Sequence, residues 1–458
     1  MRKNSRDPRD PAFLPGGPDA VSWLCAFVVL LLALPSSLVV GQLGGVGAPA
    51  NLVGLAAFLW WCWHHLHRTR PNDISTQPVR WAVFLLLGIV LVSYVWAMMR
   101  PIPADEVSPA DASILRLISL LGITLVANDG IRSTARMHVL VRYLITGALA
   151  MAVLSIFQFV TGRLWVDRIS IPGLSQSADL SLDARSGLVR PSATAISAIE
   201  FAALVSMIVP IAVMNLRSRT GIGVRHWLVP GTMVLGLMLS ISRTGILCLI
   251  AGLLVITPAL PRRWRIIGAA GATVMIVVVG LTVPGLVGTI RGLFTGLEVD
   301  PSVQSRTGSY ALALQFIERH PLLGSGLGTF LPKYWIMDNM YLQFTIETGV
   351  LGIVTLLALF VTAVVTARRA ARLFPEGRER DLAIGLTGGI TAGAVSFAFF
   401  DALSFPQAAC TLFLLMGMGG AYWRIARQMS QEGHLVEPDR EGISLPPSLA
   451  RSNRSHAR

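Results

Sequence analysis

The chain has 458 residues, of which 53% are hydrophobic and 14% are charged, and its formal net charge is +13. An ordinary soluble domain carries about 25% charged residues, so this composition excludes that class of protein. The apolar residues instead form blocks long enough to cross a bilayer as helices, which takes roughly 20 residues. We therefore predict an all-α polytopic membrane protein.

The first apolar block runs from Val21 to Val40 and follows a polar, Arg-bearing leader. It is too long for the apolar region of a signal peptide, and it lacks a cleavage site of small residues. We therefore interpret residues 1–19 as a cytoplasmic tail and the block as the first span.

About twelve spans are predicted along the chain when each needs about 20 residues. Their expected limits are 20–41, 46–66, 81–99, 113–128, 138–160, 193–216, 227–242, 244–259, 266–289, 341–367, 382–400 and 407–424. The transmembrane domain then covers residues 20–424. The polar residues 425–458 are predicted to form a disordered cytoplasmic tail.

Arginines are concentrated in alternate loops, as the positive-inside rule predicts for cytoplasmic segments. The Arg-rich loops lie at 68–80, 132–136, 217–225, 262–265 and 368–380. This alternation predicts an even number of spans in the cytoplasmic (inner) membrane, with both termini cytoplasmic. It also accounts for the net charge without a nucleic-acid partner.

Cysteine and histidine spacing gives no indication of a metal site. No CxxC pair or Cys/His ligand spacing is present, and the cysteines all lie inside apolar blocks: Cys25, Cys62, Cys248 and Cys410. Such cysteines are expected to be small apolar fillers rather than zinc ligands or a disulfide framework. The sequence therefore predicts no metal and no cofactor.

Two loops on the predicted outer side are long, at 161–192 and 291–340, and long ordered loops usually carry function. In the second loop, residues 309–320 have apolar residues at helical spacing and are followed by Pro321. This pattern predicts an amphipathic helix on the outer membrane surface. The glycines after it lack the Lys and Ser/Thr of a phosphate-binding loop, so we interpret them as turn residues.

Several arginines lie on the predicted outer side, where the positive-inside rule disfavours them. Arg243 sits at a tight turn between two spans, and a charge near membrane depth usually faces a cavity or a partner. Arg306 is expected just before the surface helix, whose N-terminus favours anions. The planar guanidinium group suits a diphosphate, whereas Arg163, Arg168 and Arg185 are interpreted as interfacial anchors.

Two further polar groups are candidates for acid–base chemistry. Asp338 stands just before the span that begins near Tyr341, where partial desolvation would raise its pKa toward that of a useful base. A nearby Arg would instead keep it ionised, and a helix N-cap is the alternative role. His320 is interpreted as a helix C-cap, with acid–base catalysis as the alternative.

A family resemblance follows from these motifs. The run Arg306 … His320-Pro-Leu-Leu-Gly-Ser-Gly-Leu-Gly-Thr-Phe … Asp338-Asn-Met-Tyr-Leu-Gln-Phe-Thr-Ile-Glu-Thr-Gly resembles the signature of the O-antigen ligase and polysaccharide polymerase superfamily. Ser240-Ile-Ser-Arg-Thr-Gly245 resembles its other Arg-bearing turn. Arg190-Pro-Ser-Ala-Thr194 with Ile199-Glu-Phe201 resembles the segment that leads into its middle span. The similarity extends over residues 190–366.

The resemblance implies a membrane-embedded glycosyltransferase that uses neither a nucleotide sugar nor a metal. Its donor would be a glycan on a polyprenyl diphosphate in the outer leaflet, and its acceptor a glycan or a lipid. The resemblance implies catalytic roles for Arg243 and Arg306, which would hold the diphosphate, and for Asp338. The implied substrate-binding residues are Arg190, Glu200, His320, Asn339 and Tyr341.

The chain departs from the ligases at Asp338, where they carry a His that activates the acceptor hydroxyl. This difference leaves room for the polymerase branch of the superfamily. The implied reaction inverts the anomeric centre. The competing hypotheses are a polysaccharide flippase without chemistry, a polymerase of the peptidoglycan type, and a structural membrane scaffold. Two questions stay open: whether the protein is a ligase or a polymerase, and whether Asp338 or His320 is the base.

Overall fold

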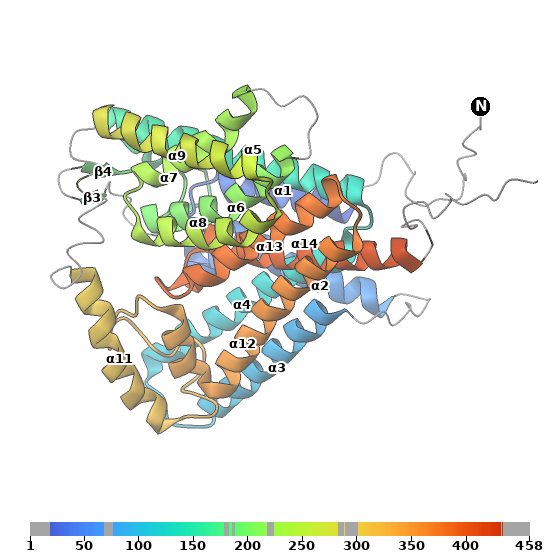
Figure 1. Ribbon diagram of the computed structural model, residues 1–458. Helices are drawn as coiled ribbons and strands as arrows, with labels where there is room; N and C mark the ends of the chain where they lie inside the picture. The colour runs from blue at the N-terminus through green and yellow to red at the C-terminus, as the bar shows by residue number, and fades with distance from the viewer. Residues whose placement is uncertain are drawn as a thin grey trace, which may run out of the picture.

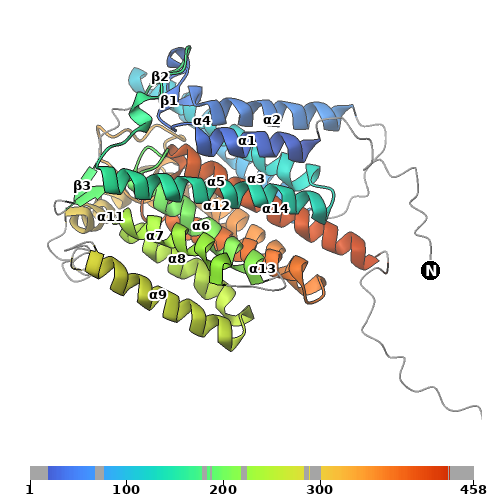
Figure 2. The same cartoon turned by 90° about the horizontal axis from the view of Figure 1, so that it is seen from above.

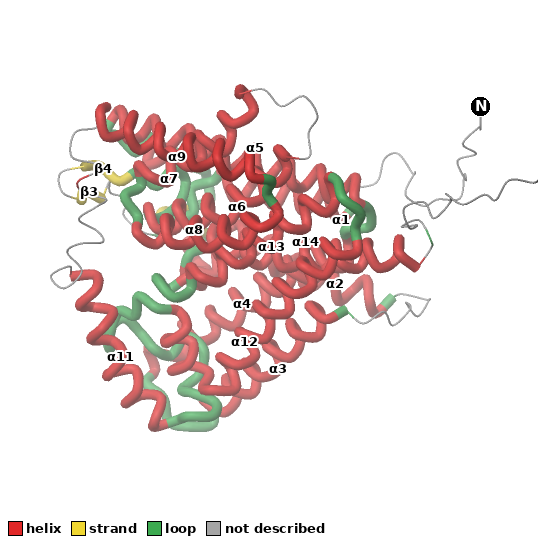
Figure 3. Tube along the Cα trace, in the orientation of Figure 1, coloured by secondary structure: helices red, strands yellow, loops and turns green. Residues whose placement is uncertain are grey.

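The computed structural model describes residues 19–67, 77–177, 183–185, 188–217, 224–282, 288, 301–431 and 433. The predicted tail residues 1–18 and 434–458 lie outside them, as does most of the segment 283–300, which contains the start of the second long loop. Figure 3 shows that the described chain is almost entirely helical.

The described α-helices are α1 (Ala20–Ala33), α2 (Pro49–Leu66), α3 (Pro78–Met98), α4 (Ala104–Gly130), α5 (Thr134–Thr161), α6 (Ala198–Arg217), α7 (Leu228–Leu239), α8 (Arg243–Ile256), α9 (Arg262–Thr282), α11 (Pro301–Arg319), α12 (Met340–Leu373), α13 (Arg378–Ser396) and α14 (Pro406–Gln431). Short 3₁₀ turns are η2 (Gly41–Gly47), η3 (Val166–Arg168), η4 (Val224–Trp227), η5 (Thr257–Ala259) and η6 (Ala402–Ser404). The strands are β1 (Leu38–Val39), β2 (Ser175–Gln176), β3 (Asp183–Arg185) and β4 (Leu188–Arg190). β1 pairs antiparallel with β2, and β3 with β4.

A helix overlaps every predicted span, so the all-α polytopic class is confirmed. Within the described residues, seven helices are long and apolar enough to cross a membrane by themselves: α3, α4, α5, α6, α9, α12 and α14. Three shorter apolar helices, α1, α7 and α8, accompany them. The chain is therefore a multi-pass membrane protein, while the count of twelve spans stays a prediction.

Some helix limits differ from the expected limits of the apolar blocks. α1 ends at Ala33 rather than near residue 41, because Pro35 lacks the N–H that a continuing helix needs. α14 continues to Gln431, past the expected limit at 424. In its last turns, Arg424 donates to the carbonyl of Ile131 at 2.6 Å, so a polar turn still packs on the bundle. Hydropathy predicts how long an apolar stretch is, but it does not locate the residue at which a helix ends.

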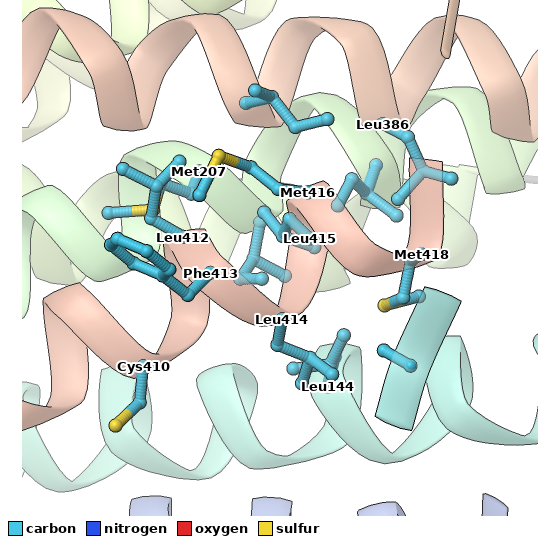
Figure 4. Packing of buried hydrophobic residues seen from close by; sticks show 14 of the residues in the cluster. Leu144, Met207, Leu386, Cys410, Leu412, Phe413, Leu414, Leu415, Met416 and Met418 are labelled. Carbon is cyan, nitrogen blue, oxygen red and sulfur yellow. The ribbon is translucent and has the colours of Figure 1, made fainter. Parts of the chain in front are cut away.

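The centre of the bundle is built by α14 and α6. α6 packs mainly on α13 and α8, and α14 packs on α4 and α12. Figure 4 shows the run from Leu412 to Met418 of α14 surrounded by other apolar side chains, including Met207 of α6. Glycines let α13 approach its neighbours closely, since a Cβ on Gly389 would lie 2.5 Å from the Met207 carbonyl oxygen.

Contacts between distant segments define the two ends of the bundle. At one end Arg136 Nε donates to Asp19 at 2.7 Å, and Arg217 pairs with Asp381. α14 ends on that side, opposite β1, β2 and α11 (Figure 2). At the other end, Ser36 N donates to the Thr194 carbonyl at 2.9 Å, and Met340 N donates to the Phe397 carbonyl at 2.8 Å. Arg-rich segments expected inside thus share one end, while the predicted outer loops share the other, where α11 forms the edge of the molecule (Figure 1).

Reporter fusions test the predicted topology. A reporter of cytoplasmic location fused after Arg380 should be active, and one fused after Lys333 should be inactive, because the two positions belong to Arg-rich and outer loops respectively. A reporter that works only outside the cytoplasm should give the reverse pattern. The same location for both fusions would refute the orientation.

Candidate functional site

The loop that follows α11 is inserted into a break in α12. Gly349 has φ 68° and ψ −171°, which no helical residue adopts. A continuous helix would join Val350 N–H to Ile346 and Leu351 N–H to Glu347. Instead, Val350 N donates to Pro321 O at 2.8 Å, and Leu351 N donates to Leu322 O at 3.3 Å.

The carbonyls on the other side of the break are satisfied by the same loop. Ser325 N donates to Ile346 O at 3.1 Å, and Gly326 N donates to Glu347 O at 2.7 Å. The loop thus replaces, bond for bond, the helical hydrogen bonds lost at Gly349. The glycines Gly324, Gly326 and Gly328 all have positive φ, which confirms that they are turn residues.

Glu347 fixes the far part of this loop. Its side chain is 2% exposed, and the backbone N–H groups of Gly328 and Phe330 donate to its carboxylate. Gly328 also lies against α4, where an added Cβ would be 2.3 Å from Ser113 Oγ. The sequence motif contained Glu347, yet nothing in its spacing indicated that it would anchor a loop.

The two residues before α12 have different roles: Asn339 caps the helix, and Asp338 does not. Asn339 is the N-cap, and its Oδ1 accepts from Tyr341 N at 3.0 Å and from Leu342 N at 3.3 Å. Asp338 is half-buried and, among the described residues, forms no hydrogen bond or ion pair. The cap role considered for Asp338 therefore falls to its neighbour. The Tyr341 hydroxyl donates to Ala394 O at 2.6 Å and ties α12 to α13.

His320 closes the C-terminal end of α11, as the C-cap prediction expects. Its N–H donates to Ile317 O at 3.2 Å, and its carbonyl accepts from Gly324 N at 3.0 Å. Burial, together with the guanidinium groups of Arg100 and Arg319, lowers the pKa of His320 below its ordinary value. Arg100 Nη1 lies 2.5 Å from His320 Nε2. Since Arg only donates, Nε2 is the acceptor and the neutral ring carries its proton on Nδ1.

Arg243 and Arg190 belong to one turn between α7 and α8. Arg243 is the first residue of α8 and is 8% exposed. The turn is tight, with Ile241 at φ 49° and Ser242 as the N-cap. Arg190 Nε, at the end of β4, donates to Ser240 O at 3.1 Å. The structure thus brings these two predicted site residues to the same turn.

Arg306 lies inside α11 rather than before it, because the helix begins at Pro301. Pro is well tolerated in the first turn of a helix, and the polar first turns carry no apolar periodicity from which to predict them. The side chain of Arg306 is outside the described part of the structure, so its contact with a diphosphate stays a prediction.

Glu200 is fully buried and binds backbone groups. Its carboxylate accepts from Ile196 N at 2.9 Å and from Gln407 N at 2.7 Å. Gln407 in turn donates to Leu31 O at 2.9 Å. These bonds join the start of α6, the start of α14 and the end of α1. All described contacts of Glu200 are thus with the protein itself, and its predicted contact with substrate stays untested.

Two charged residues outside the sequence motifs, Arg116 and Asp401, line a small cavity together with Glu347. Arg116 of α4, Gln343 and Glu347 of α12, and Asp401 before η6 line a cavity of about 40 Å³. Burial raises the pKa of Asp401, while the Ser404 hydroxyl and Arg116 oppose that shift. Asp338 is close enough to Asp401 to raise the same pKa further. An Arg inside the predicted span 113–128 was the signal available in the sequence.

Charged and polar side chains from several elements gather at this end of the bundle. Within the described ranges, no group of three or more His, Cys, Asp or Glu residues is placed to hold a metal ion. Arg190 is hydrogen-bonded to the turn that leads into Arg243, and Asp338, just before α12, has no hydrogen-bond partner among the described residues.

Comparison with known proteins assigns this region to a family. Residues 228–357 match the family model described as O-antigen ligase. The match runs from α7 through the first part of α12, and it includes Arg243, Arg306, His320 and Asp338. It places the segment in the O-antigen ligase and polysaccharide polymerase superfamily, as the sequence resemblance predicted.

Two other comparisons add little. No curated protein matches the chain. One solved structure, titled "Structural coordination of polymerization and crosslinking by a peptidoglycan synthase complex", contains a chain that is 17% identical with a TM-score of 0.43. The alignment covers 76% of this chain and 98% of that chain. A similarity at this level carries no conclusion about function.

The fold and the family match together define a class. The protein is a multi-pass membrane protein, and its residues 228–357 match the model of the O-antigen ligase family.

The inserted loop predicts a sharp effect at Gly349. Gly349→Ala should lower the thermal unfolding midpoint, because its φ/ψ region costs a residue with a Cβ about 1–3 kcal/mol and the new Cβ would lie 2.3 Å from the Leu322 carbonyl carbon. Gly268→Ala in α9 is the matched control, since a Cβ there meets nothing within 4 Å. Its midpoint should be unchanged or higher. Equal midpoints for wild type and Gly349→Ala would contradict the interlocked loop.

Proposed function

We propose that the protein transfers a polyprenyl-diphosphate-linked glycan to a glycan or lipid acceptor at the outer face of the cytoplasmic membrane. The single observation that carries the proposal is the family match over residues 228–357, which contains Arg243, Arg306 and Asp338. The structure supports it by setting the turn of Arg243 and the start of α12 at the same end of the bundle. α13 packs on both α8 and α12, and the carbonyl of Phe397, just after α13, accepts from Met340 N at the start of α12.

In the proposed reaction, the acceptor hydroxyl attacks the anomeric carbon of the donor from the face opposite the diphosphate. A new glycosidic C–O bond forms while the C–O bond to the diphosphate breaks, so the anomeric centre inverts. The proton of the hydroxyl passes to the Asp338 carboxylate. The charge that builds on the departing phosphate oxygen is stabilised by Arg243 and Arg306, which take the place that a metal ion has in other enzymes.

The remaining predicted residues receive more limited roles in this proposal. Arg190 shares the turn of Arg243 and adds positive charge for the diphosphate. His320, Asn339, Tyr341 and Glu200 use their described side-chain atoms to hold neighbouring segments. We infer that these four act by positioning the backbone around the substrate.

The arginines are tested in proteoliposomes that contain the purified protein, a polyprenyl-diphosphate-linked glycan and EDTA. Arg243→Ala and Arg306→Ala should each remove the formation of new glycosidic bonds. Each loses a charge-assisted contact of roughly 1.5–3 kcal/mol in binding, and more in the transition state, where charge builds on the leaving phosphate. Arg→Lys variants should recover little activity, since an ammonium cannot contact two phosphate oxygens at once. Full activity of the Lys variants, or dependence of the wild type on added divalent metal, would refute the proposed chemistry. Glycan movement across the vesicle membrane without new bonds would favour a flippase.

Asp338 is tested by a pair of neighbouring substitutions. Asp338→Asn should lower turnover about 10²–10⁴-fold, the usual contribution of a general base, while donor binding is retained. Asn339→Asp is the control, because Asp and Asn are equally good N-caps, and it should remain close to wild type. Asp338→His restores the residue of the ligases and should retain part of the activity. Normal turnover of Asp338→Asn would exclude it as the base.

The branch of the superfamily is decided by the intermediates that accumulate in cells without the protein. Single lipid-linked repeat units identify a polymerase, and long chains left on the lipid identify a ligase. The carboxylate at Asp338, where the ligases carry a His, favours the polymerase branch in our proposal.

A further inference from the structure

A second cavity lies next to the candidate site and has a volume of about 270 Å³. Its polar lining comes from Ser36 after α1, Asn51 of α2, Arg116 of α4, Ser177 after β2 and Ser404 of η6. Five segments that are far apart in sequence therefore build one concave surface. Ser177 and Ser404 are exposed, so the cavity opens at the end of the bundle that carries the outer loops.

This cavity shares lining residues with the smaller cavity at the candidate site. Arg116, Leu120, Leu403 and Ser404 line both. On one side of Arg116 lie Glu347 and Asp401, next to Asp338. The larger cavity alone contains Asn51, Ser36 and Ser177. Arg116 thus stands between the proposed base and an open polar cavity.

The donors of Arg116 are not used by the described part of the protein. Its Nε is buried and has no hydrogen-bond partner there. A buried donor left in this state is costly, and it usually marks a place where water or a ligand binds. Its charge is faced by the carboxylate of Asp401 rather than by a second cation.

These features select a class of ligand. Because the Asp401 carboxylate faces Arg116, the region has no surplus of positive charge that would favour an anion. Arg and Asn donors beside Ser, Asn and carboxylate acceptors suit hydroxyl groups, which both donate and accept. The volume is just under the roughly 300 Å³ at which small-molecule pockets begin, so it suits one sugar ring. Leu120, Leu403 and Val39 supply apolar wall for the carbon face of the ring.

We propose that this cavity is the acceptor subsite, which binds one neutral sugar residue, with Arg116 as its principal hydrogen-bond donor. Binding there holds the acceptor next to the half of the site that contains Asp338, and Arg116 is a specificity-determining residue. The role of the bound sugar as acceptor rests on the proposed function, whereas the binding of a sugar at Arg116 does not depend on it.

The subsite is tested with the full-length protein in lipid nanodiscs by saturation-transfer NMR. The probes are a panel of neutral methyl hexopyranosides and methyl glucuronide. A neutral member of the panel should bind the wild type. Arg116→Gln should weaken that binding about tenfold or more, the loss expected for a charge-assisted hydrogen bond. Arg116→Lys keeps the charge with fewer donors and should lie between the two, and Asn51→Ala should also weaken binding.

Two controls separate the subsite from the fold and from the proposed reaction. Arg142→Gln removes an exposed Arg of α5 and should leave sugar binding unchanged, and thermal unfolding midpoints show whether each variant is folded. Arg243→Ala should keep sugar binding although it loses glycan transfer. The inference fails if no neutral sugar binds, if folded Arg116→Gln and Arg116→Lys bind like wild type, or if methyl glucuronide binds best. Normal transfer by Arg243→Ala together with sugar binding lost in Arg116→Gln would refute the proposed reaction and leave the sugar site standing.

Discussion

The break in α12 at Gly349 and the loop inserted there form the constraint on which the rest of the outer end depends. Four backbone groups that a helix would have paired internally are paired instead with residues 321–326. Buried backbone groups near membrane depth cannot remain without partners, so the break and the loop require each other. Through them, the end of α11, the start of α12, and α3, whose Ser93 Oγ donates to Leu323 O at 2.5 Å, are fixed as a unit.

The same unit brings charged groups together in a mostly apolar protein. Glu347 receives backbone N–H groups of the inserted loop, and Gly328 of that loop contacts α4. α4 carries Arg116, and Asp401 approaches it from the segment before α14. Buried polar groups are tolerated only where they have partners. Glu200 and Glu347 have theirs in backbone N–H groups, whereas Asp338 and the Arg116 Nε have no hydrogen-bond partner among the described residues.

This division gives the proposed chemistry a physical basis. Arginines that lie at a turn and on a surface helix can approach a lipid diphosphate from the membrane boundary without any ion to recruit. In the proposed reaction, the Asp338 carboxylate, which has no hydrogen-bond partner among the described residues, would accept the proton. An acceptor cavity on the opposite side of Arg116 would supply the second substrate from the aqueous side. The two substrates would then meet at the start of α12, where Asn339, and not Asp338, caps the helix.

Much of the fold follows from the sequence. Bilayer thickness sets the length of the apolar blocks, and the positive-inside rule predicts which loops carry many arginines. A helix overlaps each predicted span, and the motif around Arg243, Arg306 and Asp338 indicated the family before any coordinates. Helix ends such as Gln431 and Pro301 were missed, since they are set by polar packing and not by hydropathy.

The pairing of residues far apart in the chain was decided only by the tertiary structure. No spacing rule joins Arg116 to Asp401, or Glu347 to the N–H of Gly328, because hydrogen bonds and charge pairs depend on distance in space. The structure likewise shows that Asn339 and not Asp338 caps α12. The sequence by itself therefore determined the all-α membrane class and the motif that matches the O-antigen ligase model. The arrangement of donors and acceptors at the site arose only when packed helices fixed their positions.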